Sequence, residues 1–320
     1  MVGALCKVAL FGECMLEFQG AAFDAMQQGF GGDSLNTAVY LARCGRDRGI
    51  AVSYATGLGD DRWSAALMER WTAEHVGLDL VRCMPGRLPG LYLIEVDGHG
   101  ERTFSYWRDS SAAKAYFDVA QTPLEATLDH WDALYVSGIS LAILPPDGQE
   151  RLLAAMQAVR RRGGCVVFDN NFRPRLWPDR AQALDCYARA FALANIALVT
   201  ADDHQSLHQM DSLDQAVEHA QYLPSEEIVI KRGADATMVR SPEGEWGEAA
   251  TEHVPQVVDT TAAGDSFAAG YLSRRLSGAS SLDAARFGNR LAARVIQHRG
   301  ALIPAQAMAD LVSCPSARAK

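Results

Sequence analysis

Short apolar runs alternate with helix-like segments along most of the chain, and this order constrains the fold more than any other feature. The runs predict buried strands, and between them apolar residues recur at helical spacing. Strands are expected at 7–11, 52–58, 134–137, 165–168, 196–199 and 228–231, and helices near 35–42, 63–75, 149–162 and 282–296. Because strands and helices alternate, the sequence predicts an α/β fold with a central, mostly parallel sheet flanked by helices.

One region departs from this alternation and predicts a small β-sheet lid. Two apolar runs, 91–96 and 102–107, flank the turn-forming segment Asp97-Gly98-His99-Gly100. Such a pattern is typical of a β-hairpin. We expect the lid to comprise about 14–20, with a short edge strand, and about 84–108. The whole chain of 320 residues is expected to form a single domain that carries this lid.

Composition and charge narrow the class of protein. The chain is 48% hydrophobic and 22% charged, as in ordinary globular proteins, and no apolar run reaches membrane-spanning length. Its net charge of −9 argues against nucleic-acid and anionic-membrane partners. The seven cysteines are odd in number and lack C-x-x-C spacing, which favours reduced thiols and a cytoplasmic location.

The stretch from Val257 to Leu272, VVDTTAAGDSFAAGYL, carries the strongest chemical signal. Its apolar pair predicts the end of a strand, and a run of small residues then leads into a helix. Unpaired N–H groups at a helix start, here those of Ala262, Ala263 and Gly264 together with Asp265, can hold an anion. Asp265 lies at the mouth of this turn and is a candidate general base. The turn alone leaves open the alternative that Asp265 is only a helix N-cap.

A second turn of small residues precedes the helix expected near 35–42. Gly31 and Gly32 allow a ligand to approach the backbone closely. Asp33 and Asn36 are then placed to bind sugar hydroxyls. The alternative is a plain glycine turn in which Asp33 or the next residue, Ser34, caps the helix.

Two arginines are candidates for binding an acidic ligand. Strand alternation puts Phe104, Tyr106 and Arg108 on one face, where a covered guanidinium group requires an acceptor such as a carboxylate. Arg108 reaching solvent at the strand end is the alternative. Arg173 follows the strand at 165–168, at the edge where ligands bind open α/β sheets, and it could reach a carboxylate or phosphate. Its alternative is a structural salt bridge.

His204 and His208 are four residues apart on an expected helix, a spacing that some metal sites use. The sequence offers no third ligand nearby and no H-E-x-x-H pattern. We therefore interpret both as exposed helix residues.

Two motifs resemble signatures of the ribokinase-like (PfkB) carbohydrate kinases. The segment 259–265, DTTAAGD, is similar to that family's D-T-x-[GA]-A-G-D signature. The resemblance implies that Asp265 is the catalytic base and that Ala262, Ala263 and Gly264 form the anion hole. Ala262 stands where many members have glycine, which should restrict the backbone torsions there. GGDSLN, residues 31–36, is similar to the family's sugar-binding signature and implies that Gly32, Asp33 and Asn36 bind the sugar.

Other segments resemble the branch of the family that phosphorylates 2-keto-3-deoxygluconate. They are the hairpin region and the segment DNNFRPRLW at 169–177. The resemblance implies that Tyr92, Tyr106, Arg108 and Arg173 contact an acid sugar, whose 6-hydroxyl is phosphorylated by ATP. A neutral-sugar kinase of the fructokinase or ribokinase type is the alternative within the family. A non-catalytic sugar sensor is the alternative outside the enzymes.

The segment IVIKRGADATMV at 228–239 resembles the family's nucleotide-phosphate loop, and the chain has no P-loop motif. The resemblance implies ATP and Mg²⁺, and leaves a monovalent cation open. The residues expected on the nucleotide side are Asn171, Lys231, Gly233 and Asn289. Asp203 departs from the family's usual glutamate, so we expect it to meet the metal only through water. We also expect a homo-oligomer, although no residue pattern fixes the number of subunits.

Overall fold

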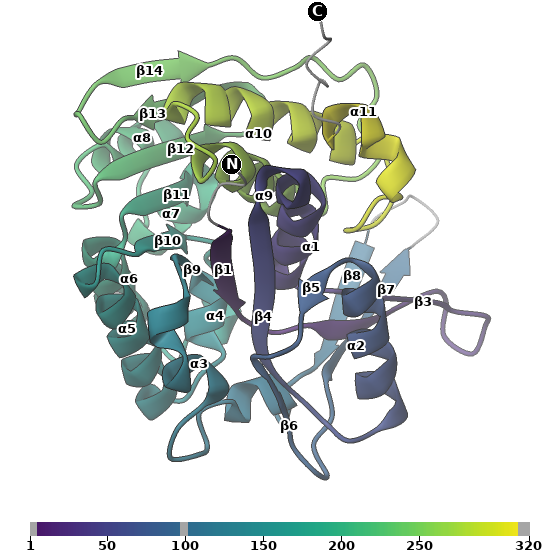
Figure 1. Ribbon diagram of the computed structural model, residues 1–320. Coiled ribbons are helices and arrows are strands. Elements are labelled where there is room, and N and C mark those ends of the chain that lie inside the picture. Colours follow the sequence, from purple (N-terminus) through teal and green to yellow (C-terminus); the bar gives the residue numbers. More distant parts are fainter. Residues whose placement is uncertain (1–4, 97–101, 313–320) are drawn as a thin grey trace, which may run out of the picture.

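The computed structural model describes residues 5–96 and 102–312, and its main feature is a ten-stranded sheet (Figure 1). The strands of this sheet are β1 (Cys6–Phe11), β4 (Ile50–Leu58), β5 (Val76–Gly77), β6 (Val81–Cys83), β9 (Ala133–Ser137), β10 (Cys165–Asp169), β11 (Ile196–Thr200), β12 (Glu227–Arg232), β13 (Asp235–Arg240) and β14 (Trp246–Ala249). Their order is β14-β13-β12-β11-β10-β9-β1-β4-β5, and β6 also pairs with β4. Only the pairs made by β13 are antiparallel within this sheet. The predicted α/β class is confirmed, and the predicted strands are present.

Helices cover both faces of the sheet. One face packs against α1 (Asp33–Gly45), α2 (Arg62–Ala73), α9 (Ala263–Arg275), α10 (Ser281–Val295) and α11 (Ala309–Val312). The other packs against α3 (Pro123–Ala126), α4 (Gly138–Ala142), α5 (Pro146–Arg161), α6 (Arg180–Leu193), α7 (Ala201–His208) and α8 (Leu213–Ala220), several of them in the teal part of Figure 1. Short 3-10 helices lie at Arg46–Arg48, Ala112–Ala115, Leu128–His130, Pro174–Leu176 and Ala305–Met308.

The alternation of β1 shows why both faces need cover. Val8 and Leu10 belong to the core on the α1 side, whereas Ala9 and Phe11 belong to the core on the α5 side. Side chains of a strand point to opposite faces in turn, so an apolar run without polar positions must be buried on both.

A separate four-stranded sheet has the order β3-β2-β7-β8. Its strands are β2 (Met15–Gln19), β3 (Gln27–Gly31), β7 (Gly90–Val96) and β8 (Arg102–Trp107). The predicted hairpin is present as the antiparallel pair β7–β8, whose turn at 97–101 lies outside the described residues. The strand predicted as an edge is interior, because β2 pairs with both β3 and β7. The sequence did not reveal β3, since QQGFG lacks the apolar alternation of a strand.

The strand predicted to end at Val257-Val258 is wrong. Both side chains are exposed, and the segment before α9 has no strand pairing among the described residues. The Val258 N–H instead donates to the carbonyl of Ile296 at 2.8 Å. Two neighbouring valines predict a strand locally, but here no strand lies beside them to complete the ladder.

Two further observations concern the part of the chain that the structure describes. No helix there combines the length and apolar character needed to cross a membrane. The six cysteines within it are free.

Candidate functional site

A cleft of about 420 Å³ lies where the carboxyl ends of β10, β11 and β12 approach the small sheet. Its lining residues are Met15, Gly32, Asp33, Tyr92, Phe104, Tyr106, Asp169, Asn171, Arg173, Thr200, Asp203, Lys231 and 260–265. The carboxyl ends of parallel strands are the usual ligand edge of an open α/β sheet. The cleft therefore brings together most of the residues that the sequence predicted.

Helix α9 begins inside this cleft without a capping side chain. Its N-cap is Ala262, with a left-handed backbone at φ 60°, and Asp265 follows in the first turn. The alternative that Asp265 is merely an N-cap is therefore wrong. The Ala263 N–H donates to the carbonyl of Thr260 at 3.2 Å, which engages one amide predicted to be open. The helix start still presents its positive dipole end, with small side chains around it.

A buried carboxylate holds the turn that precedes α9. Asp259 Oδ1 accepts from the N–H of Thr261 at 3.0 Å and from its hydroxyl at 2.7 Å. Asp259 Oδ2 accepts from the N–H of Gly300 at 2.8 Å. These bonds fix the turn to the chain that follows α10, so the anion-facing backbone is held in place before any ligand arrives.

Asp265 is half-buried and lies among other charges. Asn36 Nδ2 donates to its Oδ2 at 2.8 Å. Burial raises the pKa of Asp265 to about 7, with the negative charges of Asp33 and Asp169 acting in the same direction. The Asn36 hydrogen bond and the positive charge of Lys231 oppose this rise in pKa. A carboxylate with a pKa near neutrality is suited to accept a proton at neutral pH.

Helix α1 begins at Asp33, its N-cap is Gly32, and no side chain caps it. The predicted cap by Asp33 or Ser34 is therefore wrong. The Asp33 carboxylate instead accepts from Asn171 Nδ2 at 2.8 Å, and the Ser34 hydroxyl lies 3.0 Å from that of Tyr54. Burial also raises the pKa of the Asp33 carboxyl.

Lys231 brings a positive charge to the start of α9. Its Nζ lies 3.3 Å from both carboxylate oxygens of Asp169, and both side chains are largely covered. A Cβ built on Gly264 would lie 3.7 Å from the same Nζ. Sequence reasoning did not single out Asp169, although a carboxylate that ends a buried strand is a recognisable signal.

Arg173 extends into the cleft from the segment after β10. Its Nη1 donates to Asp203 Oδ1 at 3.0 Å and to the carbonyl of Phe172 at 2.7 Å. The Arg173 side chain is 51% exposed, whereas that of Asp203 is 20% exposed. The proposed alternative, a salt bridge, is thus present, and the open side of the guanidinium group still faces the cleft.

Arg108 does not line the cleft. It forms a buried ion pair with Glu13, so the alternative of an arginine in solvent is wrong. Arg108 Nε and Glu13 Oε1 have no hydrogen-bond partner within 5–96 and 102–312. Tyr92 and Tyr106 do line the cleft, with ring centroids 5.9 Å apart.

Gly233 and Asn289, both predicted on the nucleotide side, lie outside the cleft lining. Gly233 adopts φ 62° in the exposed turn between β12 and β13. The buried Asn289 amide accepts from the Thr237 hydroxyl at 2.9 Å and donates to the carbonyls of Ala249 and Ala250 at 3.1 Å. Contact of either residue with a nucleotide stays a prediction.

The sequence pattern of the pfkB family of carbohydrate kinases matches residues 6–308 of this chain. The chain belongs to the pfkB family. It is a sugar kinase with the family's α/β fold and small second sheet.

Curated relatives and a solved structure agree with this membership. The kinase is 44% identical over 310 residues to the 2-dehydro-3-deoxygluconokinase of Dickeya dadantii (strain 3937), covering 94% of this chain and 98% of the relative. It is 43% identical over 305 residues to the enzyme of that name from Escherichia coli (strain K12), with the same two coverages. The structure of aminoimidazole riboside kinase from Salmonella enterica, complexed with aminoimidazole riboside and an ATP analogue, is 26% identical. It superposes with a TM-score of 0.77 and covers 95% of this chain and 99% of its own.

The cleft of the kinase fits an anionic phosphate better than it fits a directly bound metal. Lys231 and the uncapped start of α9 lie together, and the small side chain of Gly264 leaves room beside them. Asp169 and Asp203, in contrast, are each already paired with a cation. Either carboxylate would have to give up its ion pair to bind a metal directly, and a water-mediated contact of Asp203 with Mg²⁺ stays a prediction.

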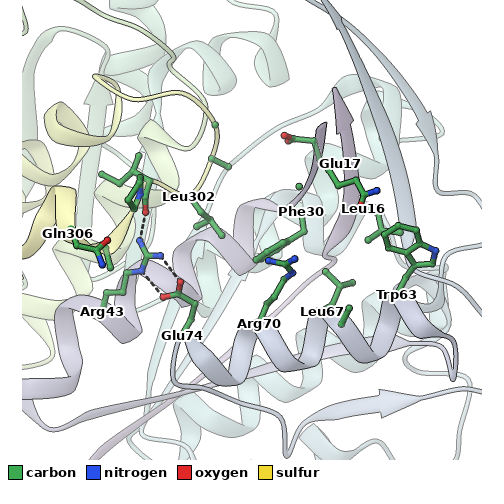
Figure 2. Close-up of a pocket in the computed structure, with 18 residues that line it drawn as sticks. Leu16, Glu17, Phe30, Arg43, Trp63, Leu67, Arg70, Glu74, Leu302 and Gln306 are labelled. Atoms are coloured by element: carbon green, nitrogen blue, oxygen red, sulfur yellow. Dashed lines mark hydrogen bonds and ion pairs between the residues drawn. The ribbon is translucent and has the colours of Figure 1, made fainter. Parts of the chain in front are cut away.

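A second hollow, of about 650 Å³, lies on the other side of β2 (Figure 2). We call it the α2 pocket because β2, β3, α2 and residues 300–306 line it. Arg43 donates to both carboxylate oxygens of Glu74, at 2.7 and 2.6 Å, and to the carbonyl of Ile303 at 2.7 Å. Because Arg43 is already paired with Glu74, whereas Asp265, Lys231 and the start of α9 all lie at the cleft, we assign the chemistry to the cleft.

The interpretation of the two histidines as exposed helix residues is wrong for the kinase. His204 is fully buried, His208 is half-buried, and a third histidine, His219 of α8, lies against them. Sequence reasoning missed His219 because it lies on another helix, and only the packing of α7 on α8 brings it close.

Proposed function

We propose that this kinase transfers the γ-phosphoryl group of ATP, with Mg²⁺, to the 6-hydroxyl of 2-keto-3-deoxy-D-gluconate (2-dehydro-3-deoxy-D-gluconate). One observation carries the proposal: Asp265, with a pKa near 7, stands at the uncapped start of α9 in the same cleft as Arg173. The names of the relatives support the choice of substrate.

In this mechanism Asp265 removes the proton from the substrate. The 6-oxygen forms its bond to the γ-phosphorus while its proton passes to the Asp265 carboxylate, and ADP leaves with the bridging oxygen. Mg²⁺ would supply neutralisation of the phosphate charge. The role of Asn36 is to orient Asp265, because its amide holds one carboxylate oxygen and leaves the other for the hydroxyl.

The start of α9 stabilises the charge that develops on the phosphoryl group. The N–H groups from Ala262 to Asp265 would act together with Lys231, although the Ala263 N–H must first leave its bond to Thr260, and the Asp259 bonds hold the turn in place. Preorganised donors of this kind need no rearrangement as the reaction proceeds. The small sheet acts as a lid, whose closure would exclude water as a competing acceptor.

Arg173 and Arg108 would recognise the substrate carboxylate. Arg173 is open to the cleft, whereas Arg108 lies outside the cleft lining in its buried pair with Glu13 and would reach the carboxylate only after a rearrangement. Each charge-assisted hydrogen bond contributes roughly 1.5–3 kcal/mol. A neutral sugar would forfeit these bonds, so the two cations would favour the acid sugar.

The first test measures ADP release with Mg²⁺ and ATP, comparing 2-keto-3-deoxygluconate with fructose and ribose. Turnover of the keto-acid with little turnover of the neutral sugars is expected. Preferred turnover of fructose or ribose would overturn the substrate and leave Asp265 as base. Sugar binding without any turnover would favour a non-catalytic sensor.

The arginines are tested separately with Arg173→Ala and Arg108→Ala. Each should raise KM for the keto-acid by about tenfold or more, since each charged hydrogen bond is worth roughly 1.5–3 kcal/mol. Arg175→Ala is the matched control, because Arg175 is exposed in the same segment and does not line the cleft. An unchanged KM in Arg108→Ala would confine Arg108 to its structural pair with Glu13.

A further inference from the structure

Three imidazole rings converge where α7 packs on α8. Atoms of His204, His208 and His219 that can ligate a metal all lie within 4.8 Å of one another. His204 and His208 share a face of α7 because they are one helical turn apart. The ring centroid of His208 lies 4.4 Å from that of His204 and 4.6 Å from that of His219.

The hydrogen bonding of these rings is incomplete. His204 Nε2 lies 2.9 Å from His219 Nδ1, whereas His204 Nδ1 is buried and has no partner within the described ranges. A buried polar atom left without a partner costs free energy and requires an explanation. A hydrogen bond between two of the rings does not account for the third, which packs against both.

We propose that His204, His208 and His219 form a binding site for a transition-metal ion of the Zn²⁺ class, separate from the Mg²⁺ of the phosphoryl-transfer reaction. Three imidazoles and one open position form a familiar zinc coordination set. Nitrogen ligands of a tetrahedral ion lie about 3.4 Å apart for bonds of about 2.0–2.1 Å. The ligand atoms lie within 4.8 Å of one another, so the rings would have to turn to reach that spacing, and the exposed His219 gives the ion access from solvent.

The bound ion would fasten α7 to α8. Helix α7 also carries Asp203, which lies 3.0 Å from Arg173 at the cleft. One proposed ligand, His204, is therefore the residue next to Asp203, which contacts the proposed substrate-binding arginine. Metal binding to the folded state alone should raise the melting temperature, because ligation favours that state.

The test uses the full chain after removal of metals with EDTA, and it needs no substrate. Addition of Zn²⁺ should raise Tm by several degrees, and Co²⁺ should give the visible absorption of a tetrahedral, nitrogen-ligated ion. His219→Gln and His208→Gln should abolish both effects. His253→Gln is the matched control, since this exposed histidine lies in a loop outside α7 and α8.

Two further comparisons make the Zn²⁺ titration decisive. His219 is exposed, so its replacement should leave the metal-free Tm unchanged even if replacement of the buried His204 unfolds the chain. Cys83 is an exposed thiol, so the titration is repeated in Cys83→Ser to remove thiolate binding. Retention of the Zn²⁺ shift in His219→Gln, or the absence of any shift in the unmodified chain, would overturn the site. Neither result depends on kinase activity.

Discussion

Two helices, α1 and α9, lie side by side and begin at the same cleft, yet their starts differ in what surrounds them (Figure 1). Neither has a capping side chain. A Cβ on Gly32, at the start of α1, would lie 2.1 Å from the carbonyl oxygen of Glu13. A Cβ on Gly264, at the start of α9, meets nothing closer than Lys231 Nζ at 3.7 Å.

The difference shows that similar sequence motifs meet different demands. The absence of a side chain at Gly32 allows one backbone to pack closely on another, a demand that exists without any ligand. The small residues at α9 leave space beside a helix start and a cation, a demand that we expect a bound anion to explain. Substitutions at the two starts should therefore fail in different ways.

The largest expected effect is at α9. Asp265→Asn should lower kcat by about 10²–10⁴-fold, the usual contribution of a general base, with KM for both substrates little changed. Steady-state kinetics measure this loss. Asp214→Asn, an exposed carboxylate in α8, is the control. Near-normal turnover in Asp265→Asn would remove Asp265 as the base.

The same variant also distinguishes lost chemistry from lost folding. The pKa of Asp265 is raised in the folded state, so the native state holds its proton more tightly than the unfolded state does. Ionisation at pH 8 therefore costs stability that the neutral amide of Asp265→Asn does not lose. The variant should melt higher than the unmodified chain at pH 8, and the difference should vanish as the pH falls toward 4.

The next effect is at α1. Gly32→Ala should destabilise the fold by about 1–3 kcal/mol or more, because the new methyl group overlaps a backbone oxygen that cannot move freely. Urea unfolding measures the change in free energy. Gly264→Ala is the matched comparison and should keep normal stability while lowering kcat/KM for ATP by about tenfold or more, since the methyl group narrows the anion cradle. Equal loss of stability in the two variants would break the contrast between the helix starts.

The pH profile should report the charges around Asp265. Because the base must be deprotonated, kcat/KM should be constant above its pKa of about 7 and fall about tenfold per unit below it. Asp33 raises that pKa, so Asp33→Asn should move the falling limb to lower pH. If the falling part of the kcat/KM profile stays at the same pH in Asp33→Asn, the charge of Asp33 does not affect the pKa of Asp265.

The smallest effect should come from Ala262→Gly. Ala262 has a left-handed backbone, which costs roughly 1–2 kcal/mol for a residue with a Cβ. Glycine removes this strain but makes the unfolded chain more flexible, so a net gain of below about 1 kcal/mol is expected. Thermal unfolding measures it, with Ala269→Gly, inside α9, as the control that should lose stability. A loss of stability in Ala262→Gly would contradict the claim that the left-handed backbone of Ala262 is strained.

The sequence predicted the structural features that depend on residues close together along the chain. The buried strands follow from local apolar runs, and the turn with Asp265 follows from a motif of seven residues. The pairing of Arg108 with Glu13 could not be predicted from the sequence, because 95 positions separate the two residues and only the junction of the two sheets brings them together. His219 was missed for the same reason. Helix caps were also mispredicted, since Asp33 forms a bond across the cleft that local sequence cannot reveal.

Strand β2 lies between the cleft and the α2 pocket and lines both of them. Met15 lines the cleft, whereas the next two residues, Leu16 and Glu17, line the α2 pocket. A displacement of β2 is therefore expected to change the shape of both hollows. A compound that fills the α2 pocket should act on the cleft through this one strand.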